Sequence, residues 1–229
     1  MEARFKMITG ERKDLEELME IVKTYNSLAV VGCDGCVGIY QIGGFKEAES
    51  LASLLKMGDK IKNGVVQDAE AFTVIRQCDK ELIEKELGGK LDKFEAIVST
   101  ACGVGVQTMA AVFEDKVVYP ALNTLFMGVQ DREGAELYEL CKGCGDCVLH
   151  LTGGICPMTR CAKGLLNGPC GGAVDGKCEV GDYTNDCAWV LIYEKLKSMD
   201  RLDLYTTFRL PRDRRPSMSP RKLAGGAKY

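Results

Sequence analysis

The sequence predicts an α/β protein in which an open parallel sheet is followed by a cysteine- and glycine-rich domain, a C-terminal helix and an extended basic tail. Three observations lead to this prediction. Short apolar runs alternate with amphipathic segments in the first half, eight of the 12 cysteines fall within residues 141–187, and the last 25 residues carry six net positive charges. The implied domains are residues 1–133, 134–204 and 205–229.

The α/β prediction rests on strand-like runs that are separated by helical ones. Apolar residues spaced i, i+3, i+4, i+7 between Leu15 and Val22 indicate an amphipathic helix, and a second stripe starts at Ala48. The expected strands are Leu28–Val31, Phe72–Ile75, Ala96–Val98 and Lys116–Tyr119, and further helices are expected at Lys80–Leu87 and from Trp189 to Leu196, the last capped by Asp186. Strands that alternate with helices are typical of an open parallel sheet.

The cysteine content and the lack of membrane or export signals indicate a compartment and a chemistry. No apolar run approaches the roughly 18 residues of a membrane span, and the N-terminus has no apolar signal-peptide core, so we expect a cytoplasmic protein. Twelve cysteines in a reducing compartment favour metal ligation over disulfides. Because His150 is the single histidine, histidine-rich zinc centres and histidine-based triads are disfavoured.

Four cysteines are expected to meet at one edge of the parallel sheet. Cys33 and Cys36 follow the first strand, Cys78 follows the second and Cys102 the third. Loops after parallel strands share one edge of the sheet, and neighbouring glycines let the backbone approach a bulky ligand. Four thiolates at one point suit tetrahedral zinc or a [4Fe–4S] cluster. The alternative is that Cys78 and Cys102 are small buried hydrophobic residues.

The other eight cysteines lie in a segment with ten glycines and little hydrophobic periodicity. Cys141, Cys144 and Cys147 have the C-x2-C-x2-C spacing of ferredoxin clusters. The remaining five are Cys156, Cys161, Cys170, Cys178 and Cys187. Eight thiolates divide into two sets of four, and the triple spacing favours an iron–sulfur cluster over a zinc ribbon in the first set. Zinc and iron–sulfur stay open for the second set, and spacing does not assign each cysteine to a set.

The basic tail, residues 205–229, contains seven basic residues and one acidic residue, Asp213. Three prolines in it disfavour a helix, so we expect an extended arm. It is either a disordered, solvated tail or an arm that lies on an acidic partner protein. Nucleic-acid binding is not expected, because the preceding 204 residues carry nine net negative charges.

Several motifs resemble a known family. In the second half they are Leu149–Gly172, Gly176–Val180 and Cys187–Trp189, which resemble the methylenetetrahydrofolate reductase C-terminal domain family. In the first half they are Val30–Cys36, Arg76–Cys78 and Ala101–Gln107, which resemble the small iron–sulfur subunit that accompanies this reductase in acetogenic bacteria. The resemblance extends from about Ile8 to Leu196.

This resemblance implies a heteromeric oxidoreductase complex of one-carbon metabolism and acetogenesis. A flavin-bearing catalytic subunit would reduce methylenetetrahydrofolate to methyltetrahydrofolate. The present chain, too short for the catalytic barrel, would be its non-catalytic electron-transfer subunit and would exchange electrons with a further subunit or a ferredoxin. Two or three [4Fe–4S] clusters are then expected, one on Cys33, Cys36, Cys78 and Cys102 and the others on the eight later cysteines, with zinc as the alternative at one site.

Two other functions stay open. A zinc-stabilised assembly module would hold a catalytic partner without a redox role, and its metal would contribute folding free energy. A thiol oxidoreductase would use Cys33 and Cys36 as a C-x-x-C pair, although ten further cysteines count against this function. Iron and acid-labile sulfide contents distinguish the first of these functions from electron transfer.

Overall fold

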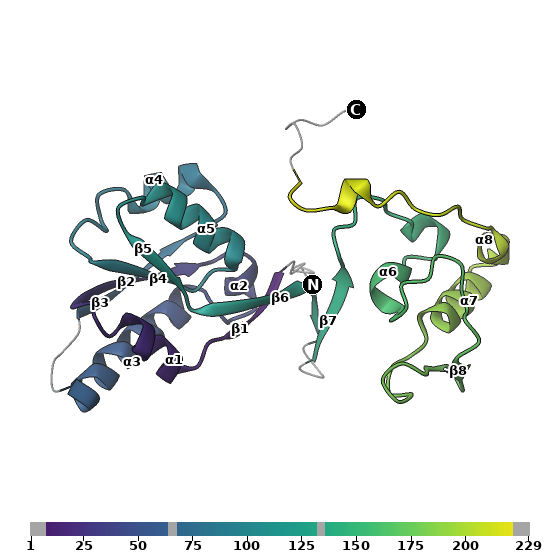
Figure 1. The fold of residues 1–229 in the computed structure, drawn as a ribbon, viewed down its shortest axis with the longest axis horizontal. Coiled ribbons are helices and arrows are strands. Elements are labelled where there is room, and N and C mark those ends of the chain that lie inside the picture. Colours follow the sequence, from purple (N-terminus) through teal and green to yellow (C-terminus); the bar gives the residue numbers. More distant parts are fainter. Residues whose placement is uncertain (1–7, 64–67, 132–135, 222–229) are drawn as a thin grey trace. The chain divides into compact units, whose positions relative to one another are not determined.

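The computed structural model describes residues 8–63, 68–131 and 136–221, which belong to two compact units (Figure 1). We call residues 1–138 the α/β unit and residues 139–229 the cysteine-rich unit. Sequence analysis instead places a boundary after residue 133 and a separate arm after residue 204, so the domain assignment stays a prediction. None of the helices in the described ranges is both long enough and apolar enough to cross a membrane.

A four-stranded parallel sheet lies at the centre of the α/β unit, with the strand order β3-β2-β4-β5 (Figure 1). Its strands are β2 (Ser27–Cys33), β3 (Asp68–Val74), β4 (Ala96–Ser99) and β5 (Val117–Pro120). Every residue of β2 after Ser27 is buried, which explains why this strand has a continuous apolar sequence rather than an alternating one. The predicted α/β class with a parallel sheet is confirmed.

Helices cover both faces of this sheet. They are α1 (Leu15–Val22), α3 (Phe45–Asn63), α4 (Lys80–Leu87) and α5 (Gly103–Val112). The short α2 (Cys36–Ile39) follows the end of β2. One apolar cluster joins α1 and α3 to Leu28 and Val30 of β2, and a second cluster joins α4 and α5 to Ala29 and Val31. Because successive strand residues point to opposite faces, each pair of helices packs on its own side of the sheet.

The sequence gives no sign of a second sheet, whose last strand runs from the α/β unit into the first residues of the cysteine-rich unit. Its strands are β1 (Ile8–Arg12), β6 (Leu122–Asp131) and β7 (Glu136–Cys141), in the order β1-β6-β7. β1 runs antiparallel to β6, with Ile8 opposite Met127. β1 has a single aliphatic residue and β7 is mostly exposed, so neither strand shows the alternation that marks a half-buried strand. Helix α5 was missed for a similar reason, since its glycines and apolar residues form no amphipathic stripe.

The cysteine-rich unit consists of short elements around one small apolar cluster. They are the 3-10 helices η1 (Leu149–Leu151) and η2 (Arg215–Ser217), the helices α6 (Pro157–Arg160), α7 (Ala188–Ser198) and α8 (Leu202–Thr206), and the strands β8 (Ala173–Val174) and β9 (Lys177–Cys178). The turn between β8 and β9 is Asp175-Gly176, and both residues have positive φ angles, as a type I′ hairpin turn requires.

The predicted final helix is confirmed as α7, whose apolar stripe buries Trp189, Ile192 and Leu196. The expectation that Asp186 caps this helix is wrong. Cys187 precedes the helix, and its side chain makes no capping hydrogen bond. The Asp186 carboxylate instead accepts a hydrogen bond from Lys177 Nζ at 2.7 Å, and this contact lowers the pKa of Asp186. The ion pair across the hairpin takes the carboxylate away from the helix end.

The backbone at Gly43 provides a test of how closely the segments of the α/β unit approach each other. A Cβ atom there would overlap the carbonyl oxygen of Thr100. Because this neighbour is backbone, we expect Gly43→Ala to lower the free energy of unfolding by about 3 kcal/mol in urea denaturation. Gly103→Ala is the control, since its Cβ would lie 3.6 Å from Thr124 Oγ1, an ordinary contact. Equal effects of both substitutions would contradict the prediction.

Candidate functional site

The four cysteines of the α/β unit follow three strands that end at the same edge of the parallel sheet. Cys33 is the last residue of β2 and Cys36 the first of α2, while Cys78 lies in the loop after β3 and Cys102 precedes α5 after β4. In this sheet β3 lies next to β2 on one side and β4 lies next to it on the other, so the order of the strands reverses at β2. Open α/β sheets bind their ligands at such a switch point.

The Cys33 thiol lies closest to the apolar interior. It is buried in an apolar cluster with Val37, Ala101 and Leu122, against which Cys102 packs. Burial raises the pKa of Cys33, the backbone amides of Gln77 and Gly35 lower it, and the charges of Cys102 and Cys78 raise it again. Cys33 is therefore within electrostatic range of both Cys102 and Cys78, and a shared site of all four cysteines stays a prediction.

A buried glutamine fixes the loop that carries Cys78. Gln77 is fully buried, and its Nε2 donates hydrogen bonds to the carbonyl oxygens of Val31 at 2.9 Å and Gly32 at 2.8 Å. Its Oε1 accepts a hydrogen bond from Ser99 Oγ at 2.6 Å. The Gln77 side chain thus joins the ends of β2 and β4 to the loop after β3. Sequence analysis missed Gln77, because a polar residue beside a cysteine gives no sign that it will be buried.

Glycines allow these loops to approach each other closely. A Cβ at Gly35 would lie 3.5 Å from Cys33 Sγ and 3.3 Å from the Ile75 carbonyl oxygen. At Gly105 it would lie 2.9 Å from the Cβ of Gln77. Sequence analysis assigns the glycines beside the cysteines to the approach of a ligand. In the structure, glycine is already favoured at these positions because the loops approach one another closely and leave little room for a Cβ atom.

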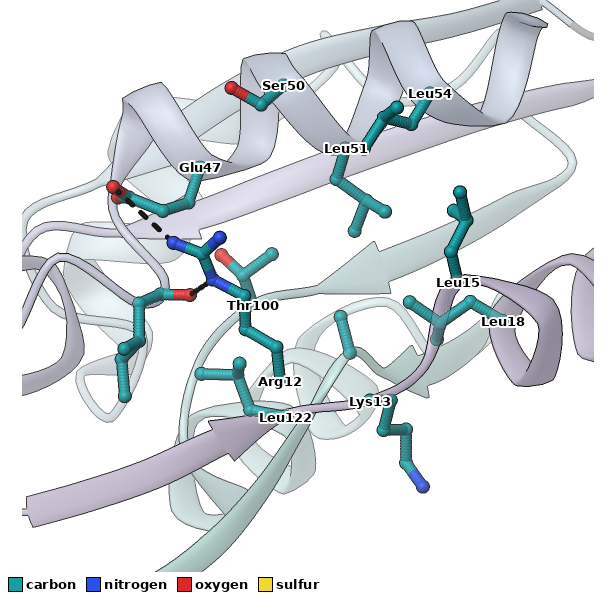
Figure 2. Close-up of a pocket in the computed structure, with 12 residues that line it drawn as sticks. Arg12, Lys13, Leu15, Leu18, Glu47, Ser50, Leu51, Leu54, Thr100 and Leu122 are labelled. Atoms are coloured by element: carbon teal, nitrogen blue, oxygen red, sulfur yellow. Dashed lines mark hydrogen bonds and ion pairs between the residues drawn. The ribbon is translucent and has the colours of Figure 1, made fainter. Parts of the chain in front are cut away.

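A cavity of about 110 Å³ lies elsewhere in the α/β unit (Figure 2). Leu15, Leu18, Leu51 and Leu54 form much of its apolar lining. At its polar end the Arg12 guanidinium donates to the carbonyl oxygens of Gln41 at 2.8 Å and Ile42 at 3.2 Å, and it lies 3.9 Å from Glu47. None of the residues that line this cavity is a cysteine, although Ile42 and Leu122 of the lining also pack in the apolar cluster that contains Cys33.

In the cysteine-rich unit, Cys141, Cys144 and Cys147 lie on one curled loop. Gly143 and Gly145 both have positive φ angles, which lets the chain turn between the cysteines. The Gly143 amide donates to Cys141 Sγ at 3.3 Å, and the Cys144 thiol lies 3.7 Å from the Asp146 carbonyl oxygen. The Asp146 backbone and, to a smaller extent, the Arg212 guanidinium hold the pKa of Cys144 below its ordinary value, against the effect of burial.

The five later cysteines surround α6, the β8–β9 hairpin and the start of α7. Cys156 and Cys161 flank the single turn of α6, and Thr159 Oγ1 in that turn donates to the Leu140 carbonyl oxygen at 3.1 Å. Cys161 and Cys178 pack against the apolar cluster that contains Cys187. Cys170 is exposed, with its Sγ 3.6 Å from Lys163 Nζ. Lys163 also pairs with Glu179, which raises the pKa of this lysine.

The described part of the basic tail contacts its own unit. Arg209 is buried, donates to the carbonyl oxygens of Leu166 at 2.6 Å and Leu151 at 3.1 Å, and lies over the Trp189 ring at 5.5 Å. Arg212 pairs with Asp146 at 2.8 Å. Neither alternative from sequence, a solvated tail or an arm on an acidic partner protein, predicts these contacts, and docking on a partner stays a prediction. Residues 222–229 lie outside the described residues.

Metal binding itself remains a prediction. Within the described residues, no three cysteine, histidine, aspartate or glutamate side chains are grouped closely enough to hold a single metal ion. The twelve cysteines are all free thiols in this structure. The arrangement does bring cysteines that are distant in sequence to one sheet edge in the α/β unit, and in the cysteine-rich unit three cysteines that are close in sequence share one curled loop. A soft, thiolate-binding metal or cluster matches this donor set.

Comparison with known proteins assigns a family relation to one segment. Residues 119–215 match the family model described as methylene-tetrahydrofolate reductase C terminal. The match includes all eight cysteines of the cysteine-rich unit and also Arg209 and Arg212, but none of the four cysteines of the α/β unit. The match starts at residue 119, whereas the resemblance seen in the sequence starts at about Ile8, and it ends at residue 215 rather than at Leu196. No curated protein and no solved structure matches the chain.

The Gln77 side chain predicts a measurable loss of stability. Gln77→Ala would leave the carbonyl oxygens of Val31 and Gly32 and the Ser99 hydroxyl without this partner, so we expect the free energy of unfolding to fall by about 3 kcal/mol. Gln107→Ala is the matched control, because Gln107 is exposed and bonds only locally to Gly103. Urea denaturation of the full chain measures both. A loss below about 1 kcal/mol at Gln77 would show that the loop does not depend on this network.

Proposed function

We propose that this chain is an iron–sulfur electron-transfer subunit of a heteromeric methylenetetrahydrofolate reductase. The observation that carries the proposal is the match of residues 119–215 to the methylene-tetrahydrofolate reductase C-terminal family, a segment that holds eight cysteines. The partner would be a flavin-bearing catalytic subunit that reduces methylenetetrahydrofolate to methyltetrahydrofolate. Electrons would enter or leave through a further donor subunit or a ferredoxin.

The cysteines of this chain would hold [4Fe–4S] clusters, which supply one-electron carriers. In the α/β unit the ligands would be Cys33, Cys36, Cys78 and Cys102, which follow the strands at the switch point of the sheet. The apolar cluster around Cys33 would keep water away from this site. In this role the protein needs no general base and no nucleophile, because its residues only bind the clusters and set their surroundings.

The structure supports one division of the eight later cysteines, and we include it in the proposal. Cys161 and Cys178 pack with Cys187, and Cys170 lies beside Glu179, the residue after Cys178. These four would form one set. Cys156 lies at the opposite end of α6 from Cys161, and Thr159 ties this helix to the residue before Cys141. Cys156 would therefore complete the set of Cys141, Cys144 and Cys147.

Metal analysis of the anaerobically purified full chain tests the proposal. We expect a brown protein with about eight or more iron atoms per chain and equal acid-labile sulfide, because at least two of the three cysteine sets would hold four-iron clusters. The zinc-stabilised assembly module makes the opposite prediction, which is stoichiometric zinc, negligible sulfide and no visible colour. That result would contradict an electron-transfer role.

The two units should respond differently to the loss of one ligand. The α/β unit has two large apolar clusters of its own, so Cys36→Ala should reduce iron content but leave this unit folded. The cysteine-rich unit has one small cluster, so Cys144→Ala should make residues 141–187 susceptible to limited proteolysis. Each variant serves as the control for the other. A protease-resistant 141–187 segment in iron-depleted Cys144→Ala protein would show that the metal does not stabilise this unit.

A further inference from the structure

Arg212 is a buried cation with a hydrogen-bond donor that has no acceptor. Its side chain is only 6 % exposed, and Nε donates to Asp146 Oδ2 at 2.8 Å while Nη2 donates to the Asp146 carbonyl oxygen. Its third nitrogen, Nη1, is buried and has no hydrogen-bond partner among the described residues. Buried polar atoms are nearly always paired, and an unpaired donor on a charged group is costly. The Cys144 thiol is within hydrogen-bonding range of the Arg212 guanidinium, but no acceptor among the described residues meets the geometry of a hydrogen bond at Nη1.

The position of Nη1 indicates the chemistry of the missing acceptor. Arg212, a residue of the basic tail, contacts the loop of Cys141, Cys144 and Cys147 through Asp146. It is close enough to Cys144 for its charge to act on the thiol. Asp146 already neutralises part of the guanidinium charge through Nε and Nη2. The remaining donor belongs to the same rigid fork, so its direction is fixed by these two bonds. An anionic sulfur atom bound at this loop would satisfy it.

Contacts on both sides of Arg212 in the sequence hold this residue in place. Three residues earlier, Arg209 bonds to the carbonyl oxygens of Leu151 and Leu166, and the Asn167 side chain bonds to the Arg209 backbone at 2.8 Å in both directions. Further along, Arg221 Nη1 donates to the Gly143 carbonyl oxygen at 2.5 Å. The arm is therefore attached on both sides of Arg212. Its guanidinium is positioned before any ligand arrives, which is the arrangement expected of a preorganised electrostatic group.

We propose that Arg212 is a positioning residue that donates a hydrogen bond from Nη1 to a sulfur atom of the cluster held by Cys141, Cys144 and Cys147, and so stabilises the reduced cluster. This inference rests on the proposed function, since it requires a cluster at these cysteines. Reduction adds one negative charge to the cluster, and a charged donor binds the more negative state more strongly. The reduction potential of this cluster is therefore higher with Arg212 than without it.

The test compares three variants of the anaerobically purified full chain. Arg212→Gln removes the charge, and Arg212→Lys keeps the charge but loses the planar fork. Arg215→Gln is the matched control, because this arginine lies on the same arm, is highly exposed and pairs with the adjacent Asp213. Iron and sulfide contents are measured first, and midpoint potentials then follow from redox titration monitored by electron paramagnetic resonance.

We expect Arg212→Gln to retain its iron and sulfide and to favour the oxidised form of one cluster by about tenfold, which is about 59 mV for a one-electron couple. Arg212→Lys should cause a smaller shift in the same direction, and Arg215→Gln no shift. An unchanged midpoint in iron-replete Arg212→Gln protein would overturn the inference. Absence of iron and sulfide from the parent protein would instead overturn the proposed function, so the two failures are distinguishable.

A second measurement decides the case in which Arg212→Gln loses its cluster. The parent protein is labelled with [15N]arginine and reduced, and magnetic coupling between the cluster and guanidinium nitrogen is recorded by pulsed electron paramagnetic resonance. Coupling that is present in the parent and lost in Arg212→Lys supports the inference. A parent protein with a reduced cluster and no nitrogen coupling from arginine would overturn it.

Discussion

The structure of the cysteine-rich unit depends on the contacts of one side chain, the indole of Trp189. The ring is almost fully buried, and its Nε1 donates to the Leu165 carbonyl oxygen at 3.1 Å. A Cβ at Gly168 would overlap the ring, Tyr205 packs edge-on at 5.9 Å, and Arg209 lies over its face. These contacts join α7, α8, the loop before Cys170 and the basic arm. A unit with so little apolar area needs one large aromatic group to hold several loops at once.

In the α/β unit, hydrogen bonds hold the loops in place. Its two large apolar clusters build the sheet and the helices, and only the small cluster of Cys33, Val37, Ala101 and Leu122 packs at the strand ends, where the loops begin. Gln77 and Thr100 fill this role, since Gln77 bonds to Val31 and Gly32, and the Thr100 hydroxyl donates to the Gly43 carbonyl oxygen at 2.6 Å. A fully bonded buried network of this kind specifies one arrangement of the loops. The positions of Cys33, Cys78 and Cys102 follow from it.

Regular hydrophobic periodicity made the parallel sheet predictable. Where this periodicity is absent, the strands and contacts could not be predicted. The strand at Leu28–Val31 and the helix at Lys80–Leu87 are correct, because burial on both faces and amphipathic spacing leave clear patterns. β1 and β7 carry no such pattern. The intra-unit contacts of Arg209 and Arg212 could not be read from the sequence either, since composition describes a basic, proline-rich arm but not the carbonyl oxygens that receive it. The cysteine spacing identifies candidate thiolate ligands but does not identify the metal they would bind.

Under the proposed function, the surroundings of Cys33 and of Cys144 would affect the reduction of a bound cluster differently. Cys33 is surrounded by apolar groups and neutral amides, and Arg76 in the loop before Cys78 is paired with Asp79 at 3.2 Å. Burial of this kind resists an added negative charge, and the amides of Gln77 and Gly35 offset only part of that resistance. The loop of Cys144 receives Arg212 and Arg221. Asp146 neutralises part of the charge of Arg212, but the Arg212 side chain is almost completely shielded from solvent. Water and salt screen a buried cation much less than an exposed one. The cluster in the cysteine-rich unit would then be reduced more easily, and electrons would favour the unit that carries the family match.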